Sequence, residues 1–400
     1  MKLYTVKNET SSAKTIVADD MILTKNMPTS AGSKMLAGYE SLFEAEVLTR
    51  LKNAGFELSG KTTVGEFAID LLGETAYEGD CVADGKIKNA SAEIVKSGDA
   101  MAAICLDVNG SVRRAAAQSG LVSIKPTYGT VSRYGTIPVA CSGETVSVMA
   151  KNAEDCREVL DKIVGHDDKD GTSLSEELCS KLKKDAAFAA VKKVAVLTSM
   201  LENTDDTVKS NIDAFAASLE KCGVEVSRIE SSTIAASKVA WNILMSAELC
   251  NNVSRYDGVK YGYRSQEFSG IDELYTNSRT EAFGELLKTA ILFGSETLST
   301  DNYMKVYDKA LRTRRVIAEE FAKLFEEYDA VLMPACSVME YTEKWVQANK
   351  YISYEENFYT APASITGLPA VCVGGVQLVG KAFSENALLD IAEKCEKEGK

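Results

Sequence analysis

The sequence has little that would bind a metal ion or exchange protons near neutral pH. It contains a single histidine among 400 residues, and its ten cysteines include no C-x-x-C pair. Because zinc sites are built from closely spaced cysteines and histidines, we expect no metal. The one histidine, His166, lies in the acidic segment HDDKD, which favours a solvated surface side chain over a general base.

Positive charge and long apolar runs are also scarce. Lysines and arginines number 45 against 58 aspartates and glutamates, and the net charge of −13 predicts that the chain repels nucleic acid. The sequence contains no run of about 18 apolar residues, so it predicts no membrane span. The sequence has no P-loop, and no G-x-G-x-x-G follows a strand, so we expect no cofactor. Unpaired cysteines without an apolar signal segment predict a cytoplasmic protein.

The most informative segment, residues 106–135, is LDVNGSVRRAAAQSGLVSIKPTYGTVSRYG. The apolar residues 101–106 predict a buried strand, and Asn109-Gly110 predicts a turn. The alanine-rich residues that follow predict a short helix ending at Gly120, and residues 121–125 predict another strand.

Ser111 occupies the expected N-cap of this helix. A hydroxyl there has backbone N–H groups beside it, so the turn formed by Val108, Asn109 and Gly110 could hold an oxyanion. The spacing alone leaves two interpretations of Ser111, a helix cap and a catalytic nucleophile.

The segment resembles the core of the amidase signature family, which reads D-T-G-G-S-I-R and then G-L-K-P-T-Y-G-x-V-S-R-Y-G. The chain keeps Asp107, Gly110, Ser111 and Arg113, and all of K-P-T-Y-G at residues 125–129. Within the family it is most similar to the A subunits of glutamine-dependent aspartyl/glutamyl-tRNA amidotransferases. Further matching segments follow in order at residues 24–36, 60–68, 165–173, 254–265, 325–334 and 366–383.

This resemblance implies an α/β fold with a large mixed β-sheet covered by helices on both faces. It implies a single amidase-like domain over residues 1–400 that is N-terminally short for the family, with amidotransferase-type B or C subunits, or another protein, as partners. The residues themselves predict a strand, helix and strand over 192–230, and a hairpin with a Gly-Gly turn over 370–379.

The family hydrolyses amides with a serine nucleophile, a serine in a cis peptide and a lysine base, and two of these three are missing. Alignment to the family's V-K-D-N-I segment puts Asp19 at the lysine position, and counting back from Ser111 puts Ile87 at the cis-serine position. Ser111 remains as a vestigial nucleophile. Lys86, beside Ile87, could replace the base only if its amine were neutral, and its polar neighbours favour a solvated side chain.

The substrate-binding positions are also replaced. Glutamine-using members bind the substrate carboxylate with an arginine and its amino group with an aspartate. The matching positions here are Ala290 and Asn357. Alanine cannot form the charge-assisted pair that a carboxylate needs, and the asparagine carries no charge for an ammonium group.

Two hypotheses follow from the sequence. In the first, the chain is a catalytically impaired amidase homologue that acts as a binding or scaffold subunit. In the second, it is a divergent amidase or glutaminase that hydrolyses a C–N amide bond with Ser111 and an unexpected base. A base within hydrogen-bond reach of Ser111 would favour the second hypothesis.

Overall fold

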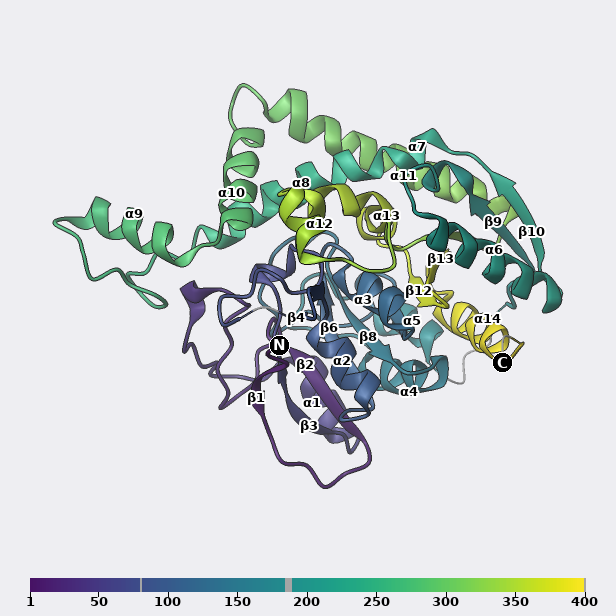
Figure 1. The fold of residues 1–400 in the computed structure, drawn as a ribbon, viewed down its shortest axis with the longest axis horizontal. Coiled ribbons are helices and arrows are strands. Elements are labelled where there is room, and N and C mark those ends of the chain that lie inside the picture. The colour runs from purple at the N-terminus through teal and green to yellow at the C-terminus, as the bar shows by residue number, and fades with distance from the viewer. Residues whose placement is uncertain (80, 184–188, 399–400) are drawn as a thin grey trace.

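A long mixed β-sheet organises the computed structural model, which describes residues 1–79, 81–183 and 189–398 (Figure 1). Its eleven strands lie in the order β1-β3-β2-β6-β8-β7-β12-β13-β11-β9-β10. They are β1 Tyr4–Lys7, β2 Thr15–Asp19, β3 Glu57–Thr62, β6 Ala102–Asp107, β7 Val122–Lys125, β8 Thr145–Ala150, β9 Lys193–Leu197, β10 Glu225–Ile229, β11 Ala330–Pro334, β12 Ala370–Val373 and β13 Val376–Gly380. A separate hairpin pairs β4 (Val82–Ala83) with β5 (Lys86–Ile87).

Fourteen α-helices surround this sheet in the described part of the chain. They are α1 Glu46–Asn53, α2 Ala90–Ser97, α3 Ser111–Ser119, α4 Ala153–Ile163, α5 Glu176–Cys179, α6 Asp206–Lys221, α7 Ser232–Ala235, α8 Ser237–Val253, α9 Ile271–Ala282, α10 Glu285–Thr297, α11 Asp308–Glu327, α12 Glu343–Ala348, α13 Ile352–Thr366 and α14 Glu385–Glu398. No helix among the described residues has both the length and the apolar character needed to cross a membrane.

Both faces of the sheet are covered, as predicted, and β6 shows why its sequence is continuously apolar. Ala102 and Ile104 pack in the buried cluster that also contains residues of α4. Ala103 and Cys105, which alternate with them, pack in a second cluster with residues of α2 and α3. Because successive side chains of a strand point to opposite faces, a strand covered on both sides needs apolar residues at every position.

The two local motifs predicted outside the core segment are confirmed. Strand β9, helix α6 and strand β10 form a parallel β-α-β unit, and Asp205 caps the helix by accepting a hydrogen bond from the Val208 N–H. Strands β12 and β13 form a hairpin across Gly374 and Gly375, whose φ angles of 58° and 79° suit the two central positions of a tight turn.

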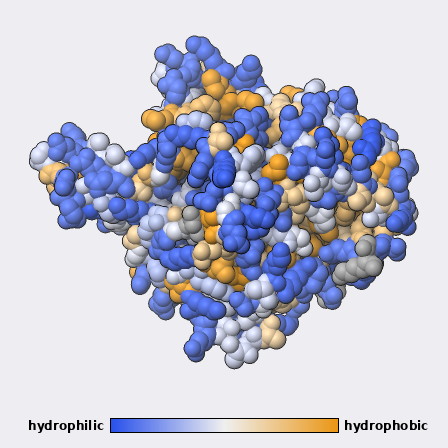
Figure 2. All heavy atoms as spheres, viewed as in Figure 1, coloured by the Kyte–Doolittle hydropathy of each residue, from blue (hydrophilic) through white to orange (hydrophobic). Residues whose placement is uncertain are grey.

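One part of the molecule extends beyond the sheet and its helices. Figure 1 shows α9 at the end of an arm that leaves the body beside α10. The surface view shows apolar side chains gathered over α10 (Figure 2), and Leu292 and Phe293 of this helix are exposed.

Candidate functional site

Ser111 lies at the first turn of α3, directly after β6, but it is not the N-cap. The N-cap residue is Gly110, which has a left-handed φ of 89° and gives no side-chain cap, so the predicted capping role of Ser111 is wrong by one position. Glycine adopts this conformation without the steric cost that a side chain would add. Ser111 is 8% exposed, and its hydroxyl forms no hydrogen bond with any residue that the structure describes.

A buried ion pair fixes α3 against the sheet. The Arg113 guanidinium donates to both oxygens of Asp107, at 2.9 and 3.0 Å, and both residues are wholly buried. Arg113 also donates to the Gln377 side chain and to the Thr360 carbonyl oxygen. Burial alone would raise the pKa of Asp107, but the guanidinium holds it below its ordinary value. The helix therefore keeps one orientation through a bidentate pair whose donors are all used.

The turn before Ser111 is covered by α13. A methyl group placed on Gly110 would lie 2.3 Å from Cβ of Thr360, which shows how closely the Thr360 side chain approaches this turn. The Thr360 hydroxyl donates to the Asn109 carbonyl oxygen at 2.7 Å, and Arg114 donates to the same oxygen at 2.8 Å. Val108 and Asn109 are buried. The turn is thus packed against α13 and its Asn109 carbonyl oxygen is bonded within the protein, but neither bond uses a backbone N–H group, the donor that an oxyanion would need.

A tryptophan completes this closure, and the sequence analysis did not identify it. The indole N–H of Trp241, on α8, donates to the Asn109 side-chain oxygen at 2.9 Å. Trp241 is wholly buried, and its ring lies so close to Gly143 that a methyl group there would be 2.4 Å from it. Trp241 and Asn109 lie 132 residues apart, so no local pattern predicts their contact. The only signal in the sequence is that tryptophan is rare, with two in the chain.

Asp19, at the predicted lysine position, lies at the end of β2 and bonds to the backbone. Its Oδ1 accepts from the Met21 N–H at 3.1 Å, and its Oδ2 accepts from the Leu106 N–H at 2.8 Å. Burial raises its pKa to about 7, although these two bonds act in the opposite direction. The carboxyl group therefore joins β2 to β6, and it forms no hydrogen bond with Ser111.

The predicted cis-serine position is apolar and the adjacent lysine is charged. Ile87 is buried in the same apolar cluster as Val112, and its N–H donates to the Tyr341 carbonyl oxygen. Lys86 forms an ion pair with Glu340 at 2.8 Å, and this hydrogen bond raises the pKa of the amine. A raised pKa keeps the lysine protonated, which is the opposite of what a general base needs.

The two predicted substrate positions are sealed from solvent. Ala290, on α10, and Asn357, on α13, are both wholly buried. The side-chain amides of Asn357 and Asn242 contact each other at 2.7 Å. With its oxygen turned toward Asn242, the Asn357 amide donates to the carbonyl oxygens of Ser353 and Asn109, each at 3.2 Å. In this orientation, the side chain at the predicted substrate-amine position bonds to the turn before Ser111.

The histidine and the metal-ligating side chains of the described residues form no site at this place. His166 is exposed, with its ring nitrogens 2.9 Å from the Leu174 carbonyl oxygen and from Asp168, as the solvated interpretation predicted. No cluster of three or more histidine, cysteine or acidic side chains in this part of the chain could hold a metal ion.

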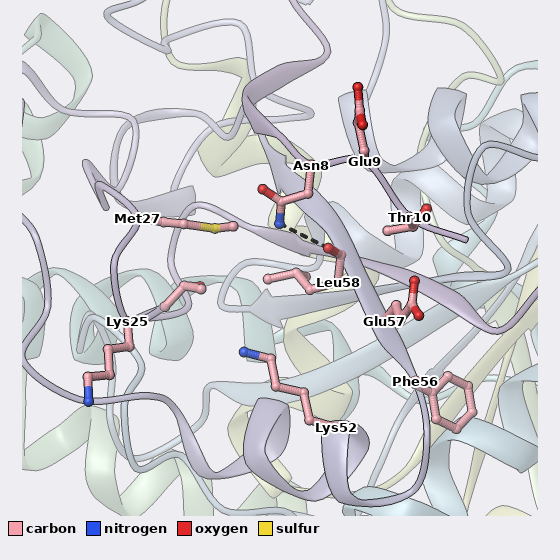
Figure 3. A pocket seen from close by; sticks show the side chains of 10 residues that line it. Asn8, Glu9, Thr10, Lys25, Met27, Lys52, Phe56, Glu57 and Leu58 are labelled. Carbon is pink, nitrogen blue, oxygen red and sulfur yellow. Dashed lines mark hydrogen bonds between the residues drawn. The ribbon is translucent and has the colours of Figure 1, made fainter. Parts of the chain in front are cut away.

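A cavity of about 550 Å³ lies elsewhere, between the start of the chain and β3. Figure 3 shows that its side chains come from residues 8–10, 24–27 and 52–58, with the Asn8 amide bonded to the Leu58 carbonyl oxygen. None of the predicted site residues lines it.

Comparison with known proteins gives the same family along nearly the whole chain. A family model described as Amidase matches residues 16–86 and 89–389. The chain is 34% identical over 409 aligned residues to the A subunit of glutamyl-tRNA(Gln) amidotransferase from Lachnoclostridium phytofermentans, covering 95% of this chain and 82% of that protein. A similar relative, from Campylobacter hominis, is 34% identical over 98% of this chain and 89% of its own length.

Solved structures agree with these relatives. The A subunit of glutamyl-tRNA(Gln) amidotransferase from Thermotoga maritima superposes with a TM-score of 0.80 at 26% identity, covering 98% of this chain and 87% of that one. A 6-aminohexanoate cyclic dimer hydrolase shares the fold, with a TM-score of 0.79 at 16% identity over 96% of this chain and 84% of its own. With a family match across nearly all of its sequence, the chain belongs to the amidase family.

Proposed function

We propose that this chain is a non-hydrolysing member of the amidase family that acts as a binding or scaffold subunit. Its partner would be an amidotransferase-type B or C subunit or another protein. The observation that carries the proposal is the state of the Ser111 hydroxyl. Among the described residues, no side chain that could accept its proton is hydrogen bonded to it, and a serine hydroxyl is a weak nucleophile without such a base.

The neighbouring positions support the same conclusion. The Asp19 carboxyl group uses its two oxygens on backbone N–H groups, and Ile87 has no group that could relay a proton. Removing one essential member of a hydrolytic triad lowers turnover by roughly 10⁴- to 10⁶-fold. Because the Asn357 side chain is buried and bonded inside the protein, it would not be available to bind the amino group of a glutamine substrate.

One observation favours the alternative, an active amidase. Ser111 lies at a helix N-terminus with its hydroxyl unbonded among the described residues and slightly exposed. A substrate that brought its own base, or a rearrangement of α13, would be needed to use this hydroxyl for hydrolysis.

Hydrolysis of glutamine and of a panel of small primary amides tests the proposal. Ammonia release by the wild type should equal that of Ser111→Ala and of the matched control Ser119→Ala, at the far end of the same helix. A rate lost in Ser111→Ala but kept in Ser119→Ala would contradict the proposal and establish the amidase.

The scaffold role is tested separately by co-expression with amidotransferase-type B and C subunits. Light scattering after size exclusion should show a complex of defined stoichiometry, and Ser111→Ala should leave that complex unchanged. If the chain elutes alone from every such mixture, B and C subunits are excluded as its partners.

A further inference from the structure

A second cavity, of about 380 Å³, lies where α13 meets α12 and the segment after β11. Its lining includes Ser337, Trp345, Glu356 and Phe358 and contains none of the positions discussed for hydrolysis. A space of this volume is in the range of small-molecule sites. The charge of the cavity and the side chains that line it indicate the class of ligand.

Glu356 is a buried acidic side chain without a basic partner among the described residues. The residue is 2% exposed, and its Oε2 accepts from the Tyr341 hydroxyl at 2.5 Å and from the Ser337 N–H at 3.0 Å. Its Oε1 makes no hydrogen bond, and the carboxylate forms no ion pair, with any residue that the structure describes. Glutamates that are buried in folded proteins are almost always paired. A cation from solution would supply the missing partner.

The walls of the cavity suit an organic cation. The Trp345 ring stacks on Tyr341, with centroids 5.2 Å apart and planes inclined by 9°. At the rim, the Lys238 ammonium already lies 6.0 Å from the centroid of the Phe358 ring. Aromatic faces attract ammonium groups through their quadrupoles, and they also cover the apolar body of a ligand.

Glu356 forms no ion pair with a described residue, and the buried Arg114 guanidinium nearby donates to carbonyl oxygens and to Thr360 instead. Lys238 and Glu355 form an ion pair at 2.6 Å on the more exposed side of the cavity. The Ser337 hydroxyl and the Asn203 amide also line the space, and neither side chain forms a hydrogen bond with a described residue. An ammonium group at Glu356 Oε1 would therefore find further acceptors for its remaining N–H donors.

We propose that this cavity binds a small primary amine in its ammonium form, with the charge on Glu356 and the organic body against Trp345 and Phe358. The site does not require Ser111, so it stands whether or not the chain hydrolyses amides. Binding would give this protein a ligand of its own on a neighbouring face of the helix that closes the Ser111 turn.

Benzylamine and its uncharged analogue benzyl alcohol are suitable probes, titrated into the full chain by calorimetry. Trp345 provides a second readout, because the other tryptophan, Trp241, is wholly buried. We expect saturable benzylamine binding with a change in fluorescence, and binding of benzyl alcohol weaker by about tenfold or more, since a charge-assisted hydrogen bond is lost.

Two variants test the site, and a third is their control. Glu356→Gln can still accept hydrogen bonds from Tyr341 and Ser337. It should weaken benzylamine binding by about tenfold or more and leave benzyl alcohol binding unchanged. Glu355→Gln is the matched control and should change benzylamine binding by less than about threefold. Trp345→Leu should weaken the binding of both probes. The variant should still fold, because the Trp345 side chain is only half-buried. The proposal is overturned if benzylamine fails to bind up to about 10 mM, or binds wild type and Glu356→Gln equally.

Discussion

Helix α13 presents two neighbouring faces that differ in how their polar groups are used. On one face, Thr360 and Asn357 bond to the turn before Ser111 and leave it closed. On the other, Glu356 lines a cavity and keeps one oxygen without a partner in the described residues. Two adjacent residues of one helix, Glu356 and Asn357, can therefore face an open cavity and a closed turn.

The difference has a physical basis. Near Ser111, the polar side chains at two predicted family positions, Asp19 and Asn357, are hydrogen bonded within the protein. Glu356 lines a cavity, and one of its carboxylate oxygens has no hydrogen-bond partner among the described residues, so a cationic donor would fill that place.

Arg113→Met should cost about 3–5 kcal/mol in the free energy of unfolding, because it leaves Asp107 charged, buried and unpaired. Urea denaturation measures the loss. Arg315→Met is the control, since its ion pair with Glu319 is exposed, and it should shift stability by less than about 0.5 kcal/mol. Equal losses in the two variants would show that the pair beneath the Ser111 turn is not a structural anchor.

The raised pKa of Asp19, about 7, predicts a pH dependence with a definite sign. Between the ordinary value of 3.8 and about 7, the folded chain holds a proton that the unfolded chain has released, so stability falls as pH rises through this window. Asp19→Asn removes this contribution. From about pH 5 to about pH 8, the wild type should lose more stability than the variant, by about 1.4 kcal/mol for each pH unit crossed below the folded-state pKa. Parallel curves would contradict the buried, protonated state.

Trp241→Phe should destabilise the protein by about 1–3 kcal/mol, because it leaves the Asn109 side-chain oxygen without its donor and opens space beside Gly143. Thermal unfolding checks the change. Trp345→Phe, which keeps an aromatic ring at a half-buried position, should cost less than about 1 kcal/mol. A larger loss at Trp345 than at Trp241 would reverse the contrast between the closed turn and the open cavity.

Glu356→Gln should have the smallest effect on folding, within about 0.5–1 kcal/mol of the wild type in urea, since the amide oxygen can accept both existing hydrogen bonds. Its effect should instead be found in amine binding. A large loss of stability would mean that Glu356 is a structural residue of α13.

The sequence predicted the local elements and the family well, because these depend on short-range patterns. The apolar residues of β6, the Asp205 cap of α6 and the Gly-Gly turn are all contained in a few consecutive positions. The helix start was missed by one residue, since Gly110 and Ser111 both suit a helix start and only the backbone angle distinguishes them.

The closure of the turn could not be predicted in the same way. Trp241 and Asn357 reach Asn109 from helices far along the chain, and periodicity carries no information about such contacts. The assignment of Asp19 and Ile87 to the family's catalytic positions stays a prediction from the resemblance. The backbone partners of Asp19 became visible only when β2 and β6 were placed side by side.

The central claim is that the Ser111 hydroxyl is not activated as a nucleophile. Covalent labelling measures its reactivity most directly. The native protein would be incubated with a fluorophosphonate, which phosphonylates activated serines with loss of fluoride, beside an active amidase of the family as positive control. Peptide mass spectrometry should find Ser111 unmodified under conditions that fully label the control. Stoichiometric labelling of Ser111, absent in Ser111→Ala, would show that a base does reach the hydroxyl and would contradict the account.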